Sequence, residues 1–256
     1  MTISAIEEAA QYLVAARRAR RPGERLPESC RPADAESAIA IQHRVTEILS
    51  EPIGAWKAAR PSSGNIMLGP IYTPAIYRTS PCPVLTNGQM ARVEPEVAFV
   101  LGKDLAPRPT PYSEAEVRAA ISETRLVLEV LGGRYADVSA VSYPEKLADS
   151  LNNQGLFVGP VVPGGFERTL ETFPLTIEGP DGVILNRDGR HPAGHPLTPL
   201  YWLANFLASR GEGLAEGQIV TTGSYCGAIE LPLAMPLQIT FGDLRCLSVE
   251  FNGSSS

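Results

Sequence analysis

The chain has 256 residues, of which 44% are hydrophobic and 20% are charged, a globular balance that leaves little room for disorder. A net charge of −6 without a Lys/Arg stripe argues against a nucleic-acid partner, because an acidic surface repels phosphate backbones. Short apolar runs, four scattered cysteines and the lack of a signal-peptide core predict a cytoplasmic protein without a membrane span or a disulfide framework.

Two helices are predicted at the start of the chain, and we expect them to form a helical lobe over residues 1–52. The first begins at the capping-box pattern Ser4-x-x-Glu7 and ends in the basic run of residues 17–21. We expect this run to complement the helix dipole and not to form a binding patch, because cations are favourable at a helix C-terminus. The second helix is predicted to begin near Asp34.

Residues 51–89 are rich in Pro, Gly, Ser and Thr, which predicts a long irregular stretch of the kind that carries function or covers a site. Residues 91–101 and 125–131 predict two strands. A helix over residues 113–124, capped by the pattern Ser-x-x-Glu, is predicted between them, and a short helix over residues 144–150 follows.

Beyond residue 155 the pattern is mostly that of strands, interrupted by one helix that begins at Thr198-Pro199 and ends at Gly211. The predicted strands cover residues 156–162, 175–178, 183–185, 218–222, 237–241 and 247–251. Residues 253–256 are predicted to form a disordered tail. Because helices cluster first and strands last, the fold class is α+β and not a regular βαβ alternation.

Acidic side chains on two predicted strands are the candidate functional residues. Glu94 and Glu96 lie two residues apart in one strand, so both point to the same face, and Pro95 between them indicates a sheet edge or a bulge. Glu129 is the one carboxylate of an otherwise apolar strand. If the strands are neighbours, the three carboxylates converge and suit Mg²⁺ or Mn²⁺. The alternative is a solvated strand face, with Glu129 paired to an arginine.

At these residues the chain resembles the 2-keto-4-pentenoate hydratase and 2-oxo acid decarboxylase branch of the fumarylacetoacetate hydrolase superfamily. The matching segments are Val93–Leu105, Leu128–Arg134, Ala148–Gly155, Gly194–Leu197, Trp202–Asn205 and Thr222–Gly227. The resemblance implies a mixed β-roll over residues 53–252 behind the helical lobe, assembly into homo-oligomers, and a role in aromatic catabolism. It also implies that Glu94, Glu96 and Glu129 hold Mg²⁺ or Mn²⁺.

The segment Gly54-Ala-Trp-Lys57 resembles the lysine motif of the same family. Three carboxylates and one divalent cation leave a charge of about −1, which would repel an anionic substrate, so nearby cations are required. Lys57 is the candidate to offset this charge and to move a proton, and we expect burial to lower its pKa toward the working range. A surface lysine in a loop is the alternative.

Four further residues are candidates for substrate binding. Arg134 would either bind the distal end of the substrate or brace Glu129. Gln154, Ser224 and Tyr225 would line the pocket, with ordinary turn residues as the alternative.

The chain departs from the family pattern at two places. Gly132 and Gly133 replace an Asp and a Ser, and the acid expected before Gly69 is absent. The first functional hypothesis is a metal-dependent hydratase-type lyase acting on small 2-oxo (2-hydroxydienoic) acids. The missing acid, which is thought to handle water in the hydratases, favours a 2-oxo acid decarboxylase or tautomerase on the same scaffold. A catalytically weak partner subunit is the third hypothesis.

Overall fold

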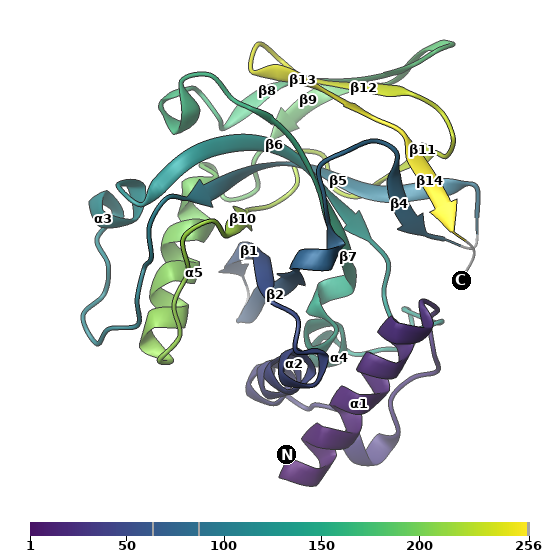
Figure 1. The fold of residues 1–256 in the computed structure, drawn as a ribbon, viewed down its shortest axis with the longest axis vertical. Helices are drawn as coiled ribbons and strands as arrows, with labels where there is room; N and C mark the ends of the chain where they lie inside the picture. Colours follow the sequence, from purple (N-terminus) through teal and green to yellow (C-terminus); the bar gives the residue numbers. More distant parts are fainter. Residues whose placement is uncertain (63, 87, 255–256) are drawn as a thin grey trace.

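The computed structural model describes residues 1–62, 64–86 and 88–254 (Figure 1). Its α-helices are α1 (Ile3–Ala19), α2 (Ala35–Leu49), α3 (Glu114–Arg118), α4 (Tyr143–Ala148) and α5 (Leu197–Ser209). Its strands are β1 (Ile53–Ser62), β2 (Asn65–Tyr72), β3 (Ile76–Tyr77), β4 (Cys82–Leu85), β5 (Met90–Leu101), β6 (Ile121–Leu131), β7 (Asn153–Val161), β8 (Thr172–Gly179), β9 (Gly182–Arg190), β10 (Ile219–Thr221), β11 (Ile229–Pro232), β12 (Leu237–Phe241), β13 (Arg245–Val249) and β14 (Phe251–Ser254).

The largest layer is a curled sheet of mixed direction, in the order β2-β1-β10-β5-β6-β7-β3, with β11 also pairing with β5. β1 pairs in parallel with β10, as β3 does with β7, whereas β6 runs antiparallel to both β5 and β7. β8, β9, β12 and β13 form a second, antiparallel sheet, which lies above β5 and β6 in Figure 1. This arrangement is the mixed β-roll of an α+β fold that the sequence predicted.

The helical lobe is held together by an apolar cluster that α1 and α2 share with α4. The buried side chains of this cluster include Leu13, Val14, Ile41, Val45 and Leu147. Asp34 caps α2 as predicted. α1 begins earlier than predicted, however, because the Thr2 hydroxyl accepts from the backbone of Ala5 and acts as the cap in place of Ser4.

The stretch predicted to be irregular, residues 51–89, instead contains β1, β2, β3 and β4. β1 pairs with β2 in an antiparallel hairpin, and its residues Ala55 to Lys57 also pair in parallel with β10, a segment far away in the sequence. Strand propensity depends strongly on such tertiary partners, which explains why proline and glycine in this stretch concealed the strands. Lys57 consequently lies in a strand of the main sheet.

Two other boundaries differ from the prediction. The predicted capping box is present, but α3 ends at Arg118, because the chain from Ile121 onward pairs with β5 as strand β6. Where a disordered tail was predicted, Gly253–Ser254 belong to β14, which pairs in parallel with β4. Residues 255–256 lie outside the described part of the chain.

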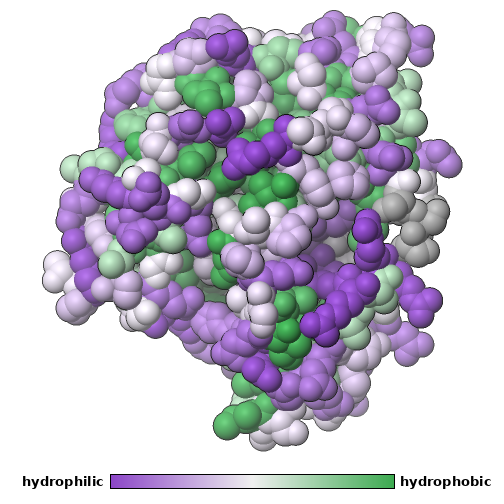
Figure 2. Space-filling model, viewed as in Figure 1, coloured by the Kyte–Doolittle hydropathy of each residue, from purple (hydrophilic) through white to green (hydrophobic). Residues whose placement is uncertain are grey.

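β5 and β6 run through the centre of the main core. Val97 and Phe99 of β5 and Leu126 and Leu128 of β6 are fully buried. On the face seen in Figure 2, hydrophilic side chains predominate and hydrophobic ones form separate patches between them. Glu96 and Glu129, which these two strands carry, are buried as well.

Candidate metal centre

The three predicted glutamates meet on one face of the main sheet. β5 and β6 are antiparallel neighbours, and their register places Glu94 directly opposite Glu129. Glu96 is two residues further along β5, so it points to the same face. One carboxylate oxygen from each residue lies within 4.8 Å of the others. The predicted neighbourhood of the two strands is confirmed, and it brings the three carboxylates to one point.

Pro95 lies beside a gap in the sheet and not at its edge. On the side of β5 that faces away from β6, β11 pairs with β5 as far as Val93, and β10 pairs with it from Ala98 onward. The loop after β10 crosses this gap, where the N–H of Tyr225 donates to the Pro95 carbonyl at 3.1 Å. The predicted edge is therefore an interruption between two neighbouring strands, through which a loop reaches the glutamates.

The end of β10 and this loop supply hydrogen bonds to Glu96 that sequence reasoning missed. The Thr221 hydroxyl donates to Glu96 Oε2, and the Gly223 N–H donates to the same oxygen at 2.8 Å. Gly223 has a φ of 123°, which favours glycine because other residues rarely adopt it. No local motif identifies these donors, since they meet Glu96 only through the pairing of β10 with β5.

Glu129 is fully buried, and one of its oxygens is held by two donors. Lys57 Nζ lies 2.5 Å from Glu129 Oε1, and Asn153 Nδ2 donates to the same oxygen at 3.0 Å. Oε2 is buried without a hydrogen-bond partner among the described residues. The cation paired with Glu129 is a lysine and not an arginine. A solvated strand face is also ruled out for Glu96 and Glu129, because these residues are only 2% and 0% exposed. A divalent cation would satisfy this orphaned oxygen.

The charges in this group are not balanced by the protein. Burial and the charge of Glu129 raise the pKa of Glu94, and the same effects together with Glu94 raise the pKa of Glu96 to about 8. Burial lowers the pKa of Lys57, but attraction to the three glutamates outweighs it, so the net shift is upward and not downward as predicted. Three carboxylates facing one ammonium fit a site that takes up further positive charge, and oxygen ligands suit Mg²⁺ or Mn²⁺.

The glutamates open into a cavity of about 670 Å³, called here the glutamate cavity. Lys57 lines it from β1 with a side chain that is 13% exposed, so the surface-loop alternative fails. Arg60 of the same strand and Ser224 of the crossing loop also line it. The acid that the family pattern predicts before Gly69 is absent, and the apolar Met67 lines the wall from β2.

Three of the four predicted substrate-binding residues lie elsewhere. Arg134 forms a buried ion pair with Asp149, Gln154 bonds with the backbone of β4, and the Tyr225 hydroxyl donates to a buried backbone carbonyl. Of the four, only Ser224 lines the glutamate cavity within the described chain. Arg134 also does not brace Glu129. Gln154 follows Asn153 on β7 and so points to the opposite face of the sheet. The turn after β6 carries Arg134 away from the glutamate cavity. A linear motif reveals neither direction.

No protein-family profile matches the chain. Its curated relatives include a 2-keto-4-pentenoate hydratase of Paraburkholderia xenovorans (strain LB400), which is 26% identical over 238 residues, or 88% of this chain and 86% of the relative. They also include a 4-oxalocrotonate decarboxylase of Pseudomonas sp, which is 28% identical over 170 residues. That second match covers 63% of this chain and 61% of the decarboxylase, less than two thirds of its length.

Solved structures share the fold. A 4-oxalocrotonate decarboxylase from Pseudomonas putida G7, complexed with magnesium and adipate, superposes with a TM-score of 0.78 at 19% identity, covering 98% of this chain and 99% of that one. A putative fumarylacetoacetate hydrolase family protein from Yersinia pestis CO92 superposes with a TM-score of 0.55 at 15% identity, covering 79% of this chain and 94% of that one.

The fold is a β-roll like that of the fumarylacetoacetate hydrolase family protein from Yersinia pestis CO92. In sequence the chain is similar to enzymes named 2-keto-4-pentenoate hydratase and 4-oxalocrotonate decarboxylase, so the predicted resemblance to this branch is confirmed. Among the described residues, no helix combines the length and the apolar character needed to cross a membrane.

Proposed function

We propose that the protein is a metal-dependent hydratase-type lyase that acts on small 2-oxo acids in their 2-hydroxydienoic form. The observation that carries the proposal is the buried, unpartnered Oε2 of Glu129, which lies in one group with Glu94 and Glu96 and beside the Lys57 ammonium. Relatives named 2-keto-4-pentenoate hydratase, which match along most of the chain, support the same reaction.

Glu94, Glu96 and Glu129 would hold Mg²⁺ or Mn²⁺, because these ions prefer oxygen ligands and keep further positions for water and substrate. When bound, the ion would supply a Lewis acid that stabilises negative charge on the keto oxygen of a 2-oxo acid. Its charge would also satisfy Glu129 Oε2 and relieve the repulsion that raises the pKa values of Glu94 and Glu96.

Lys57 is the residue that moves the proton in this proposal. Its Nζ lies 2.5 Å from Glu129 Oε1 and 3.4 Å from the Leu151 carbonyl oxygen, so the ammonium is fixed at the cavity wall. In the metal-free chain the raised pKa keeps Lys57 protonated at neutral pH. In the proposed reaction the ammonium offsets the charge of an anionic substrate and donates a proton to carbon as a dienol is converted to its keto form, and the proton released by the enol hydroxyl restores the ammonium. Ser224 offers a hydroxyl to substrate or water in the same cavity.

Turnover of 2-hydroxypenta-2,4-dienoate, measured with Mg²⁺, with Mn²⁺ and after EDTA, tests the proposal. We expect turnover to require metal. Glu129→Gln should lower metal affinity and turnover by more than about a hundredfold, because loss of even an outer partner of a metal ligand costs about 10–100-fold. Glu123→Gln is the matched control, since this carboxylate of the same strand pairs with Arg125. Metal-independent turnover that survives Glu129→Gln would refute the proposal.

A decarboxylase that acts on a 2-oxo diacid is the second candidate, and Arg60 favours it. Arg60 lines the glutamate cavity on the same strand as Lys57, and its guanidinium is suited to a second carboxylate. The acid expected before Gly69, which was expected to handle water, is also absent, and the apolar Met67 lines the cavity. CO₂ release from a vinylogous 2-oxo diacid would identify this reaction. Arg60→Gln should then raise KM for the diacid about tenfold and leave KM for the monoacid unchanged.

A further inference from the structure

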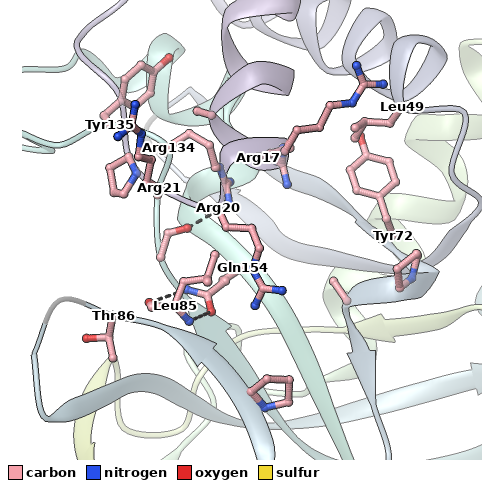
Figure 3. A pocket seen from close by; sticks show the side chains of 18 of the residues that line it. Arg17, Arg20, Arg21, Leu49, Tyr72, Leu85, Thr86, Arg134, Tyr135 and Gln154 are labelled. Atoms are coloured by element: carbon pink, nitrogen blue, oxygen red, sulfur yellow. Dashed lines mark hydrogen bonds between the residues drawn. The ribbon is translucent and has the colours of Figure 1, made fainter. Parts of the chain in front are cut away.

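A second cavity, of about 520 Å³, lies at the C-terminal end of α1 (Figure 3). Among the described residues that line it, one is acidic, Glu51, and five are arginines, namely Arg17, Arg18, Arg20, Arg21 and Arg134. The remaining walls come from β3, β4, β7 and the turn after β6. We call it the arginine cavity. The chain has a net charge of −6, so this local excess of positive charge requires its own explanation.

The helix dipole accounts for only part of this basic run. Cations in the last turn of a helix are favourable, as predicted from the sequence. Arg17, however, is turned inward, with a side chain that is 17% exposed and an Nε that is buried without a partner among the described residues. Asp149 lies 3.7 Å from its Nη2, but that carboxylate already forms a buried ion pair with Arg134. The same Nη2 lies 3.5 Å from the Ser150 hydroxyl, and the guanidinium carbon lies 5.6 Å from the centre of the Tyr72 ring. These contacts hold Arg17 inward but leave its Nε without a partner among the described residues.

The pKa of Arg17 also indicates that the positive charge in the cavity is not balanced. Burial and the nearby charge of Arg134 lower the pKa of Arg17 to about 10. A lowered arginine pKa means that the surroundings disfavour the charged form, so the neighbouring carboxylates do not balance the positive charge. An anion between the guanidinium groups would supply the missing charge and a partner for the Arg17 Nε.

The wall of the arginine cavity formed by β4 and β7 is fixed by hydrogen bonds. The Leu85 N–H donates to Gln154 Oε1 at 2.6 Å, and Gln154 Nε2 donates to the Leu85 carbonyl at 3.0 Å. Gly132 makes this arrangement possible, because a Cβ at that position would lie 2.1 Å from Gln154 Nε2. Figure 3 shows the Gln154 amide held against Leu85, with Arg20 close by. The cavity is therefore preorganised on this side.

We propose that the arginine cavity binds a small organic anion that carries a carboxylate or phosphate group on a planar apolar body. Arg17 and Arg21 bind the oxyanion, because the planar fork of a guanidinium matches carboxylate and phosphate oxygens in bidentate geometry. Tyr77 lines the cavity, is only partly buried and provides apolar surface for the body of the ligand. None of the described residues lines both cavities, so this site does not depend on the proposed lyase function.

Calorimetric titration of the full, metal-free chain with benzoate, phenyl phosphate and the neutral isostere benzamide tests the proposal. We expect at least one of the two anions to bind and benzamide not to bind. Binding of benzoate alone identifies a carboxylate site, and binding of phenyl phosphate alone identifies a phosphate site. Arg17→Gln and Arg21→Gln should each weaken binding by about tenfold or more, since each removes a charged hydrogen-bond partner. Arg245→Gln, an exposed arginine of β13, is the charge-matched control.

Arg21 is exposed at the rim, so its variant keeps the test valid even where Arg17→Gln fails to fold. Melting temperatures without ligand identify such a failure. The proposal is overturned by the absence of binding of both anions at millimolar concentration, or by benzamide binding as tightly as an anion. It is equally overturned by unchanged binding in Arg21→Gln, or by a loss in Arg245→Gln as large as that in Arg21→Gln.

Discussion

The glutamate cavity and the arginine cavity share one wall, the segment of residues 149–154, yet they gather opposite charges. Leu151 lines the first and Gln154 lines the second. Between them, the Asn153 side chain donates to Glu129, while its carbonyl accepts from Arg134 Nη1 at 2.5 Å. Charge in each cavity therefore depends on which distant side chains the fold brings together, and the net charge of the chain predicted neither.

The two cavities also differ in how firmly they hold their charges. The carboxylates of the glutamate cavity stand on paired strands, so the register of β5 with β6 sets their separation. The arginine cavity takes most of its cations from the end of α1, where the side chains are long and partly exposed. Carboxylates fixed on paired strands suit one ion of defined geometry, whereas long and partly exposed side chains can accommodate anions of several shapes.

Removing the Lys57 ammonium should have the largest effect, and this effect should be confined to the glutamate cavity. Lys57→Met should lower turnover of 2-hydroxypenta-2,4-dienoate by about 10²–10⁴-fold, the usual contribution of a positioned acid or base. Steady-state kinetics measure this loss, and Lys103→Met, an exposed lysine after β5, is the control. Benzoate binding in the arginine cavity should not change. Full turnover in Lys57→Met would remove the proton-transfer role.

The stability of the metal-free protein should fall as the pH rises. The pKa of Glu96 is raised from 4.5 to about 8 in the folded chain, so folding favours its protonated form. This contribution is fully present below the unfolded pKa of 4.5 and is lost as the pH rises toward about 8. The loss should amount to roughly a few kcal/mol in the free energy of unfolding.

Urea unfolding at about pH 5 and about pH 8 measures this loss, and Mg²⁺ should restore the stability at the higher pH because it binds only the folded site. Glu96→Gln should flatten the pH dependence, whereas Glu178→Gln on β8 should not. If the free energy of unfolding of the wild-type protein changes with pH in the same way as that of Glu96→Gln, the buried carboxylates do not destabilise the chain.

The shared wall gives the smallest expected effect. Asn153→Ala removes one donor to Glu129 Oε1 but keeps the backbone carbonyl that Arg134 uses. Mg²⁺ affinity, measured by calorimetry, should fall about tenfold, at the low end for an outer partner of a metal ligand. Binding in the arginine cavity should stay the same, as should Mg²⁺ affinity in the control Asn186→Ala on the exposed strand β9. Equal Mg²⁺ affinity in both variants would exclude a supporting role for Asn153.

Local pattern was enough to predict parts of this site and not others. Strand alternation placed Glu94 and Glu96 on one face, and an isolated carboxylate in an apolar strand singled out Glu129, because both signals lie within a few residues. Arg134 and Gln154, which were predicted to bind substrate, line the arginine cavity and not the glutamate cavity. The turn after β6 directs Arg134, and strand alternation along β7 directs Gln154, to the other side of the wall.

The sequence by itself determined the α+β class, the helical N-terminus and the two acidic strands, because periodicity and capping act over one or two turns of chain. Only the tertiary structure decided that β10 passes beside β5 and brings Thr221 to Glu96, and that β1 is a strand that carries Lys57 to Glu129. The tertiary structure also places the end of α1 at the wall of the arginine cavity. Such contacts join residues far apart along the chain, so no local pattern encodes them.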